Sequence, residues 1–173
     1  MPASYQAPMR KDQAASRTYS QSMASNTAAD VSLVSDVLAR KGNAVFTIGP
    51  EETLGAAVRV LGERGIGALV VTDEAGALRG ILSERDIVRK LAETPGQTLP
   101  KKVGEIMTRD VKTCGPKEPL VSVLKTMSAG RFRHMPVVDG GKLVGMVTVG
   151  DVVHARLNEL EQETLQLKQL IVG

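Results

Sequence analysis

The chain has 173 residues, of which 42% are hydrophobic and 2% aromatic, and its formal net charge is +3 at pH 7. This length allows one globular core or a fused pair of small units. No apolar run reaches the roughly 18 residues that would predict a transmembrane helix, so no membrane partner is expected. The scarcity of aromatic residues and the mild charge argue against a nucleic-acid partner.

Cysteine usage points to a reducing compartment. Cys114 is the single cysteine, so neither an intramolecular disulfide nor a cysteine-based zinc site can form. The two histidines, His134 and His154, are poor material for a metal site, and none is predicted. We therefore expect a cytoplasmic protein without a metal ion.

The N-terminal segment, residues 1–30, is rich in Ser, Ala, Gln and Thr and has no apolar periodicity. It is interpreted as a disordered tail or an expression remnant. A targeting segment is the alternative, because Arg10, Lys11 and Arg17 lie among Ser and Ala, although Asp12 argues against it.

From Val31 onward the chain alternates helix and strand patterns, and the whole order then recurs. The first pass predicts helices at 31–42, 54–65 and 83–92, and strands at 45–52, 68–72 and 78–83. The second pass predicts helices at 103–108, 119–130 and 150–157, and strands at 111–119, 135–139 and 142–149.

Matching positions show that the recurrence is an internal duplication. Gly80 corresponds to Gly145, and Thr47 to Thr113. We expect repeats at 31–95 and 103–157, a linker at 96–102 and a helical extension at 158–173. Because each half is too small to bury its sheet alone, the halves should pack sheet to sheet around one shared core with a pseudo-twofold axis. A cleft would then appear twice.

The C-terminal helix carries a possible heptad seam. Its members are Leu157, Leu160, Thr164, Leu167 and Ile171. Such spacing suits either a helix that packs back on its own domain or a contact in a dimer.

A Ser/Thr-x-x-Asp motif closes each repeat, as Ser83 with Asp86 and Thr148 with Asp151. One interpretation is a capping box at a helix N-terminus. The other is a ligand site, because a carboxylate accepts from both hydroxyls of a ribose while a hydroxyl and helix N–H groups donate to phosphate.

Three candidate cations, Arg131, Arg133 and His134, precede the second apolar strand, where the first half has the uncharged Gly65 to Ala68. They suit a phosphate group, although a solvated basic loop would look the same. We therefore expect an anion in the second half, and the Thr148–Asp151 cleft to fill first.

No motif for a reaction stands out. The sequence has no Walker loop and no nucleophile elbow, and Cys114 is interpreted as a small apolar filler. An enzyme using Asp151 and His134 as acid and base would lack a nucleophile. We expect a protein that is not an enzyme.

Taken together, VFTIGPEETL, GIGALVVTDEAGALRGILSERDIV, VKTCGPKEPL and RFRHMPVVDGGKLVGMVTVGDVV resemble a tandem pair of cystathionine-β-synthase (CBS) domains, the Bateman module. The likeness covers Val34 to Leu157 and extends to small stand-alone bacterial proteins of this kind. It implies an α/β (α+β) fold of two βαββα units whose clefts bind adenosine-containing ligands. AMP is placed first, with ADP, ATP, NAD(H) and S-adenosylmethionine as further candidates.

The resemblance also implies ligand-binding residues, the short strand of each half lining the cleft of the other. For the second-repeat cleft they are Thr47, Ile48, Arg131, Arg133, His134, Met135, Pro136, Thr148 and Asp151. For the first-repeat cleft they are Thr113, Cys114, Ile66, Gly67, Ala68, Ser83, Arg85 and Asp86. A regulatory module is implied, homodimeric and signalling to an unknown regulated protein. The alternative is a ligand-free scaffold for protein interaction or dimerisation.

Overall fold

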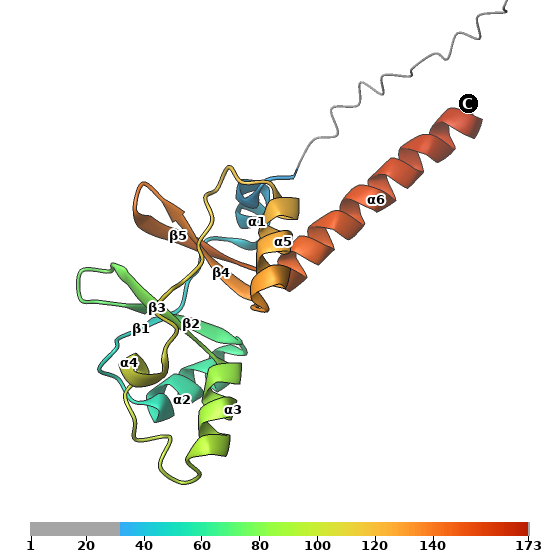
Figure 1. The fold of residues 1–173 in the computed structure, drawn as a ribbon. Helices are drawn as coiled ribbons and strands as arrows, with labels where there is room; N and C mark the ends of the chain where they lie inside the picture. The colour runs from blue at the N-terminus through green and yellow to red at the C-terminus, as the bar shows by residue number, and fades with distance from the viewer. Residues whose placement is uncertain (1–31, 173) are drawn as a thin grey trace, which may run out of the picture. The chain divides into compact units, whose positions relative to one another are not determined.

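A computed structural model describes residues 32–172, and the tail predicted at residues 1–30 lies outside the described residues. The described part is a mixture of helices and short strands (Figure 1). In order they are α1 (Val34–Lys41), β1 (Thr47–Ile48), α2 (Leu54–Arg64), β2 (Ala68–Thr72), β3 (Leu78–Ser83), α3 (Glu84–Glu93), α4 (Val103–Ile106), α5 (Leu120–Gly130), β4 (His134–Asp139), β5 (Lys142–Thr148) and α6 (Val149–Val172).

Each half contains a small sheet built on an antiparallel hairpin. In the first half β1 runs parallel to β2, and β2 pairs antiparallel with β3. In the second half β4 and β5 pair in the same way, but the counterpart of β1 shrinks to a parallel bridge between Cys114 and Val137. The β4–β5 turn uses Gly140 and Gly141, both with positive φ, as a tight two-residue hairpin turn requires.

The leading helices are exchanged between the halves. Val34, Val37 and Leu38 of α1 are buried in the core of the second half, around β4, β5 and α5. Val103 of α4, with Met107 just after it, is buried in the core of the first half. Helix α1 of the first repeat therefore packs on the second half, and α4 of the second repeat packs on the first half.

Two core clusters form, one in each half, so the expectation of one shared core is wrong. The reason is that helices cover one face of each sheet and give each half a core of its own. The other face of β2 is buried as well, because Ala68 and Val70 are buried but belong to neither cluster. Side chains alternate between the faces of a strand, so these two are directed toward the second half.

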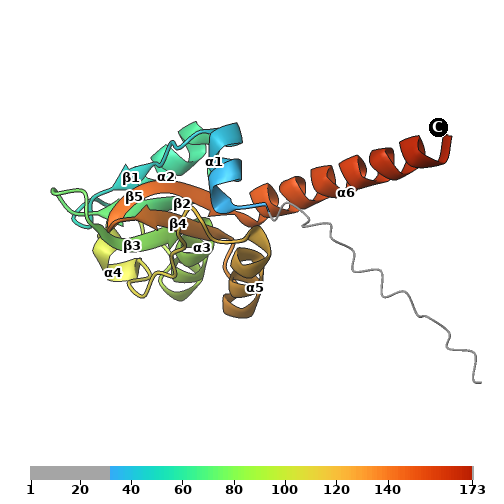
Figure 2. The same cartoon turned by 90° about the horizontal axis from the view of Figure 1, so that it is seen from above.

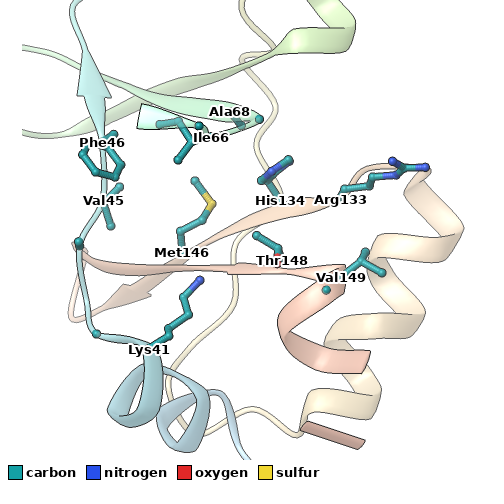
Figure 3. Close-up of a pocket in the computed structure, with 15 residues that line it drawn as sticks. Lys41, Val45, Phe46, Ile66, Ala68, Arg133, His134, Met146, Thr148 and Val149 are labelled. Atoms are coloured by element: carbon teal, nitrogen blue, oxygen red, sulfur yellow. The ribbon is translucent and has the colours of Figure 1, made fainter. Parts of the chain in front are cut away.

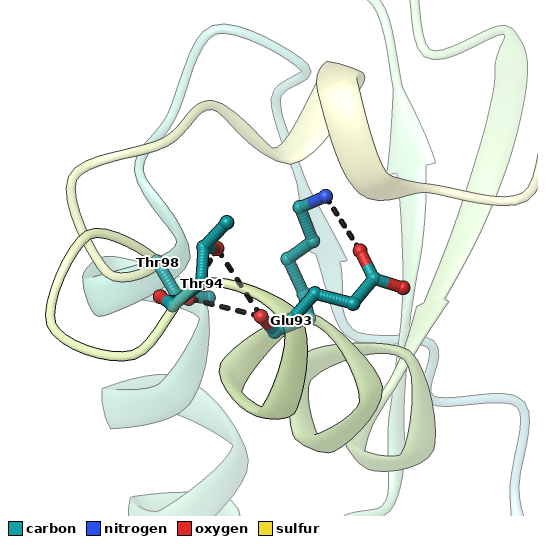
Figure 4. A network of polar contacts seen from close by, with 4 residues as sticks. Glu93, Thr94 and Thr98 are labelled. Carbon is teal, nitrogen blue, oxygen red and sulfur yellow. Dashed lines mark hydrogen bonds and ion pairs between the residues drawn. The ribbon is translucent and has the colours of Figure 1, made fainter.

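The segment predicted as a linker contains an ordered turn. Thr98 is fully buried, and its hydroxyl donates to the carbonyl of Thr94 at 2.8 Å. The Thr94 hydroxyl donates in turn to the carbonyl of Lys90 at 3.2 Å (Figure 4). These bonds satisfy carbonyls at the end of α3 and fix the path of the chain toward α4.

The final helix packs on its own half only at its start. Val152 and Ala155 are buried in the second core, whereas Leu157, Leu160, Leu165, Leu167, Leu170 and Ile171 are exposed. Figure 2 shows α6 running away from both sheets. Packing back on its own domain therefore does not describe the part of α6 beyond Leu160, because side chains 161–171 are all exposed.

Candidate ligand-binding clefts

Both Ser/Thr-x-x-Asp motifs form capping boxes. The backbone N–H of Thr148 donates to Oδ2 of Asp151 at 2.8 Å, and the N–H of Asp151 donates to the Thr148 hydroxyl at 3.2 Å. In the first half the N–H and the hydroxyl of Ser83 donate to Oδ2 of Asp86, at 2.9 and 2.6 Å. Each box engages Oδ2, so it leaves the other carboxylate oxygen for a further partner.

A cleft of about 510 Å³ opens beside Thr148 (Figure 3). We call it the Thr148 cleft. Met146 and Thr148 of β5 lie on one side of it, and Phe46 and Ile66 of the first half lie on the other. Its lining residues are Lys41, Gly42, Ala44, Val45, Phe46, Gly65, Ile66, Gly67, Ala68, Arg133, His134, Met146, Thr148, Val149 and Gly150.

A larger cleft, of about 960 Å³, opens beside Ser83 and is called the Ser83 cleft. Five of its side chains are cationic, and three are carboxylates. The cations are Arg85, Arg89, Lys112, Arg131 and Arg133, and the carboxylates are Glu84, Asp86 and Asp110. The remaining lining residues are Gly67, Ile81, Ser83, Thr108, Val111, Thr126, Ala129, Gly130, Phe132 and His134.

The two helix-to-strand loops lie only partly in the clefts expected for them. Ile66 and Ala68 line the Thr148 cleft, and Arg131 lines the Ser83 cleft, while Gly67, Arg133 and His134 line both. The reason is geometric: His134 pairs with Thr148 and Ala68 pairs with Ser83 within each half, while the halves also face each other, so one loop can reach both motifs. Of the three basic-loop residues, Arg131 lines the Ser83 cleft alone, and Arg133 and His134 are shared by the two clefts.

The short strands also lie differently from expectation. Thr47 and Ile48 do not line the Thr148 cleft, because they pair with β2 and Ile48 joins the first core, so Ala44 to Phe46 take their place. Thr113 and Cys114 are likewise absent from the lining of the Ser83 cleft, where Thr108 and Asp110 to Lys112 lie instead. Met135 and Pro136 are buried and line neither cleft.

Lys41, which no sequence motif includes, lines the Thr148 cleft and binds Asp151, although Asp151 itself is absent from the lining of that cleft. Its Nζ lies 2.6 Å from Oδ2 of Asp151. Burial tends to raise the pKa of Asp151, but hydrogen bonds from Lys41 and Thr148 outweigh it and hold the pKa below its ordinary 3.8. Among the described residues Asp86 has no such ion pair.

Arg131 adopts a strained backbone at the Ser83 cleft. Its φ is +55°, and among the described residues it is the only non-glycine with positive φ. The first half has Gly65 at the equivalent helix end, with φ of +61°. A side chain in this conformation costs roughly 1–2 kcal/mol. Arg85 stabilises the conformation by donating to the Arg131 carbonyl at 2.8 Å, and strain of this kind often marks a functional position.

His134 lines both clefts. Its ring packs against Gly67, where an added Cβ would lie 3.1 Å from Cε1. Burial lowers the pKa of His134 below its ordinary 6.5, although nearby Glu84 opposes the shift. The imidazole is therefore neutral at pH 7, so the basic loop offers two cations rather than three.

Cys114 has the environment of a core residue. It is buried in the second cluster, and burial raises the pKa of its thiol to about 12. A thiol with such a pKa stays protonated and is a poor nucleophile at neutral pH.

Within 32–172 no group of three or more His, Cys, Asp or Glu side chains is arranged to hold a metal ion. In the same range, no helix has the length and apolar character needed to cross a membrane.

A prediction concerns the Lys41–Asp151 pair. We expect Lys41→Met to lower the free energy of unfolding at pH 7 by about 1 kcal/mol, the upper range for a partly exposed ion pair. The difference in free energy of unfolding between the wild type and Lys41→Met should vanish as the pH falls through the lowered pKa of Asp151. The reason is that the protonated carboxyl no longer attracts the ammonium. Urea unfolding at pH 7 and at a series of pH values descending from 3.8 follows this decline. Lys41→Arg is the control that keeps the charge, and a loss that stays equal over the whole series would exclude this explanation.

Comparison with known proteins gives the same architecture. The family model for the CBS domain matches residues 34–93 and 103–158. The mitochondrial CBS domain-containing protein CBSX3 of Arabidopsis thaliana is 34% identical over 148 residues, which cover 81% of this chain and 72% of that protein. The CBS domain-containing protein YhcV of Bacillus subtilis is 31% identical, covering 69% and 82%.

Solved structures agree with the fold. The CBS-domain protein ATU1752 of Agrobacterium tumefaciens is 41% identical with a TM-score of 0.71, covering 72% of this chain and 99% of that one. The CBS-domain pair of protein MJ0100, solved with 5′-methylthioadenosine and S-adenosyl-L-methionine, is 32% identical with a TM-score of 0.66, covering 75% and 98%.

The fold is a paired-repeat module: a unit of one small sheet and its covering helices occurs twice. Each copy carries a Ser/Thr-x-x-Asp motif that caps a helix. The chain belongs to the CBS-domain family and carries two CBS domains. The resemblance found in the sequence is thereby confirmed.

Proposed function

We propose that the chain is a non-catalytic regulatory module that binds an adenosine-containing ligand between its CBS repeats and signals to a partner protein. The MJ0100 pair supports this, since both of its named ligands contain adenosine. AMP is the ligand that we place first, with ADP, ATP, NAD(H) and S-adenosylmethionine as further candidates.

The Ser83 cleft is the proposed site for a phosphorylated ligand, and its charge distribution is the observation that carries the proposal. Asp86 has one carboxylate oxygen outside its capping box and no ion pair among the described residues, so it can accept from a ribose. The N-terminus of α3 and the side chains of Arg131 and Lys112 suit the phosphate.

The Thr148 cleft is proposed to bind such a ligand more weakly. The nearby carboxylate of Asp151 is outside the lining and is already held by Lys41, so a ribose would have to compete with an ion pair to reach it. This reverses the order of filling expected from the sequence. Of the basic loop that motivated the expectation, Arg131 lines the Ser83 cleft alone, and Arg133 and His134 are shared.

Signalling would arise because each cleft takes residues from both halves. A ligand bound across the halves favours one arrangement of them, and a partner that recognises this arrangement detects the ligand. The proposal keeps the cytoplasm as the location, on the ground of the single thiol. The Arabidopsis relative is named as mitochondrial.

The test is a binding panel of AMP, ADP, ATP, NADH and S-adenosylmethionine, read by melting temperature and titration calorimetry. A ligand at 100 times its dissociation constant stabilises the folded state by about 2.7 kcal/mol. We expect Asp86→Asn to weaken binding of the best ligand about tenfold or more, since it removes a charged acceptor.

Asp151→Asn is the matched control, because it changes the same motif in the other cleft. It should weaken binding less than Asp86→Asn does. If none of the five compounds binds, the ligand-free scaffold replaces the sensor. If the two variants weaken binding equally, the assignment to the Ser83 cleft fails.

A further inference from the structure

The C-terminal part of α6 presents an apolar seam that nothing in the described residues covers. Leu157, Leu167 and Ile171 are 54%, 61% and 84% exposed. The seam starts one turn earlier than the sequence pattern indicated, at Val153, which is exposed as well. Its members are Val153, Leu157, Leu160, Thr164, Leu167 and Ile171, at alternating spacings of four and three residues.

We propose that α6 of a second copy covers this seam as a parallel two-stranded coiled coil. In heptad terms Leu157, Thr164 and Ile171 occupy a positions, and Val153, Leu160 and Leu167 occupy d positions. A β-branched residue at a with leucine at d favours two strands, and the layers from Leu160 to Ile171 follow this pattern. Thr164 tolerates the interior, because its hydroxyl already donates to the Leu160 carbonyl at 2.8 Å, and one polar a residue helps to fix the register.

The flanking charges select the parallel direction. In a parallel pair each g position faces the e position of the partner's following heptad. Here Arg156 at g faces Glu161 at e, and Glu163 at g faces Lys168 at e, so both kinds of pair are attractive. Arg156 also bonds Glu159 of its own helix at 2.6 Å, an exposed pair that solvent screens.

The antiparallel direction places like charges together. Pairing all six seam residues in that direction puts the twofold axis at Gln162. Glu161 and Glu163 would then each lie beside their own copies, and such contacts between like charges are repulsive. Neither carboxylate has an ion pair among the described residues that would relieve this repulsion.

Dimerisation of this kind would be connected to a ligand cleft. The same helix begins at Val149, in the lining of the Thr148 cleft, and carries Asp151 in its first turn. The two copies would therefore hold their Thr148 clefts at the near end of the shared coiled coil. This dimer does not depend on ligand binding, so it stands or falls separately from the proposed function.

A cysteine placed in the seam tests the geometry. In the parallel dimer Leu167→Cys brings two thiols together at one d layer, so mild oxidation should give a covalent dimer on a non-reducing gel. Leu165→Cys is the matched control, because Leu165 is 58% exposed but lies off the seam, and it should stay monomeric on the gel. Cys114 can remain, since its buried thiol, with a pKa of about 12, stays protonated.

Charge reversal provides the second measurement. Glu163→Lys should weaken the dimer several-fold in sedimentation equilibrium, and adding Lys168→Glu should restore it. Equal cross-linking of the two cysteine variants, or none by either, would overturn the proposal. So would cross-linking that requires a mixture of Leu157→Cys with Leu167→Cys, which is the antiparallel outcome.

Discussion

Gly80→Val should destabilise the fold by about 3 kcal/mol, through overpacking and lost hydrogen bonds. A Cβ at Gly80 would lie 2.6 Å from Sδ of Met107 and 2.9 Å from the carbonyl oxygen of Thr108. The Thr108 carbonyl cannot move aside freely, because Ile81 and Thr108 exchange backbone hydrogen bonds of 3.0 and 2.9 Å. Urea unfolding of the full chain measures the loss.

Two other glycines supply the controls. A Cβ at Gly145 would lie 2.7 Å from Cδ2 of Leu38, the flexible end of a side chain, so Gly145→Val should cost less than Gly80→Val. Gly62 has no neighbour within 4 Å of an added Cβ, and Gly62→Val should leave stability nearly unchanged. A Gly80→Val chain as stable as wild type would show that the segment after α4 is not packed tightly on β3.

The exchange of leading helices explains why this pair of glycines recurs. Gly80 lies under the segment after α4, and Gly145 lies under α1, so each glycine admits an element that packs across a hairpin. In the sequence, Gly80 and Gly145 are matching positions of the two repeats. The sequence could not show why both are glycine, because periodicity does not indicate on which half a helix packs.

Much of the fold was predictable because its signals are local. Apolar periodicity, glycine turns and capping residues predicted the helices and hairpins close to their observed positions. The strand predicted at 111–119 shrank to the single bridge at Cys114, since the edge of a sheet depends on its neighbours. The heptad spacing also predicted the seam of α6, although only the structure shows that its own domain leaves it exposed.

The clefts were less predictable because they join segments far apart in the sequence. The duplication revealed both Ser/Thr-x-x-Asp motifs. Both of them cap helices, which was one of the two interpretations of the sequence. The partners of each motif depend on how the halves face each other, and this put Arg131 with Asp86. Lys41 is the end of an ordinary helix in the sequence, and only the docking of α1 brings it to Asp151.

Replacing Arg131 with glycine should separate binding from stability. Arg131→Gly removes a cation from the Ser83 cleft and gives the position the residue that the first half has at Gly65. Glycine adopts positive φ without strain, so the free energy of unfolding should hold or rise by up to about 1 kcal/mol. AMP binding should weaken about tenfold, the loss of one charge-assisted contact to phosphate.

The most direct measurement is a calorimetric titration of AMP and of adenosine into the wild-type chain and into Arg131→Gly. The wild type should bind AMP more tightly than adenosine, and the substitution should remove most of that difference while leaving adenosine binding unchanged. Equal affinity of the wild type for the two compounds would contradict a phosphate site in the Ser83 cleft. So would an AMP affinity that the loss of Arg131 does not change.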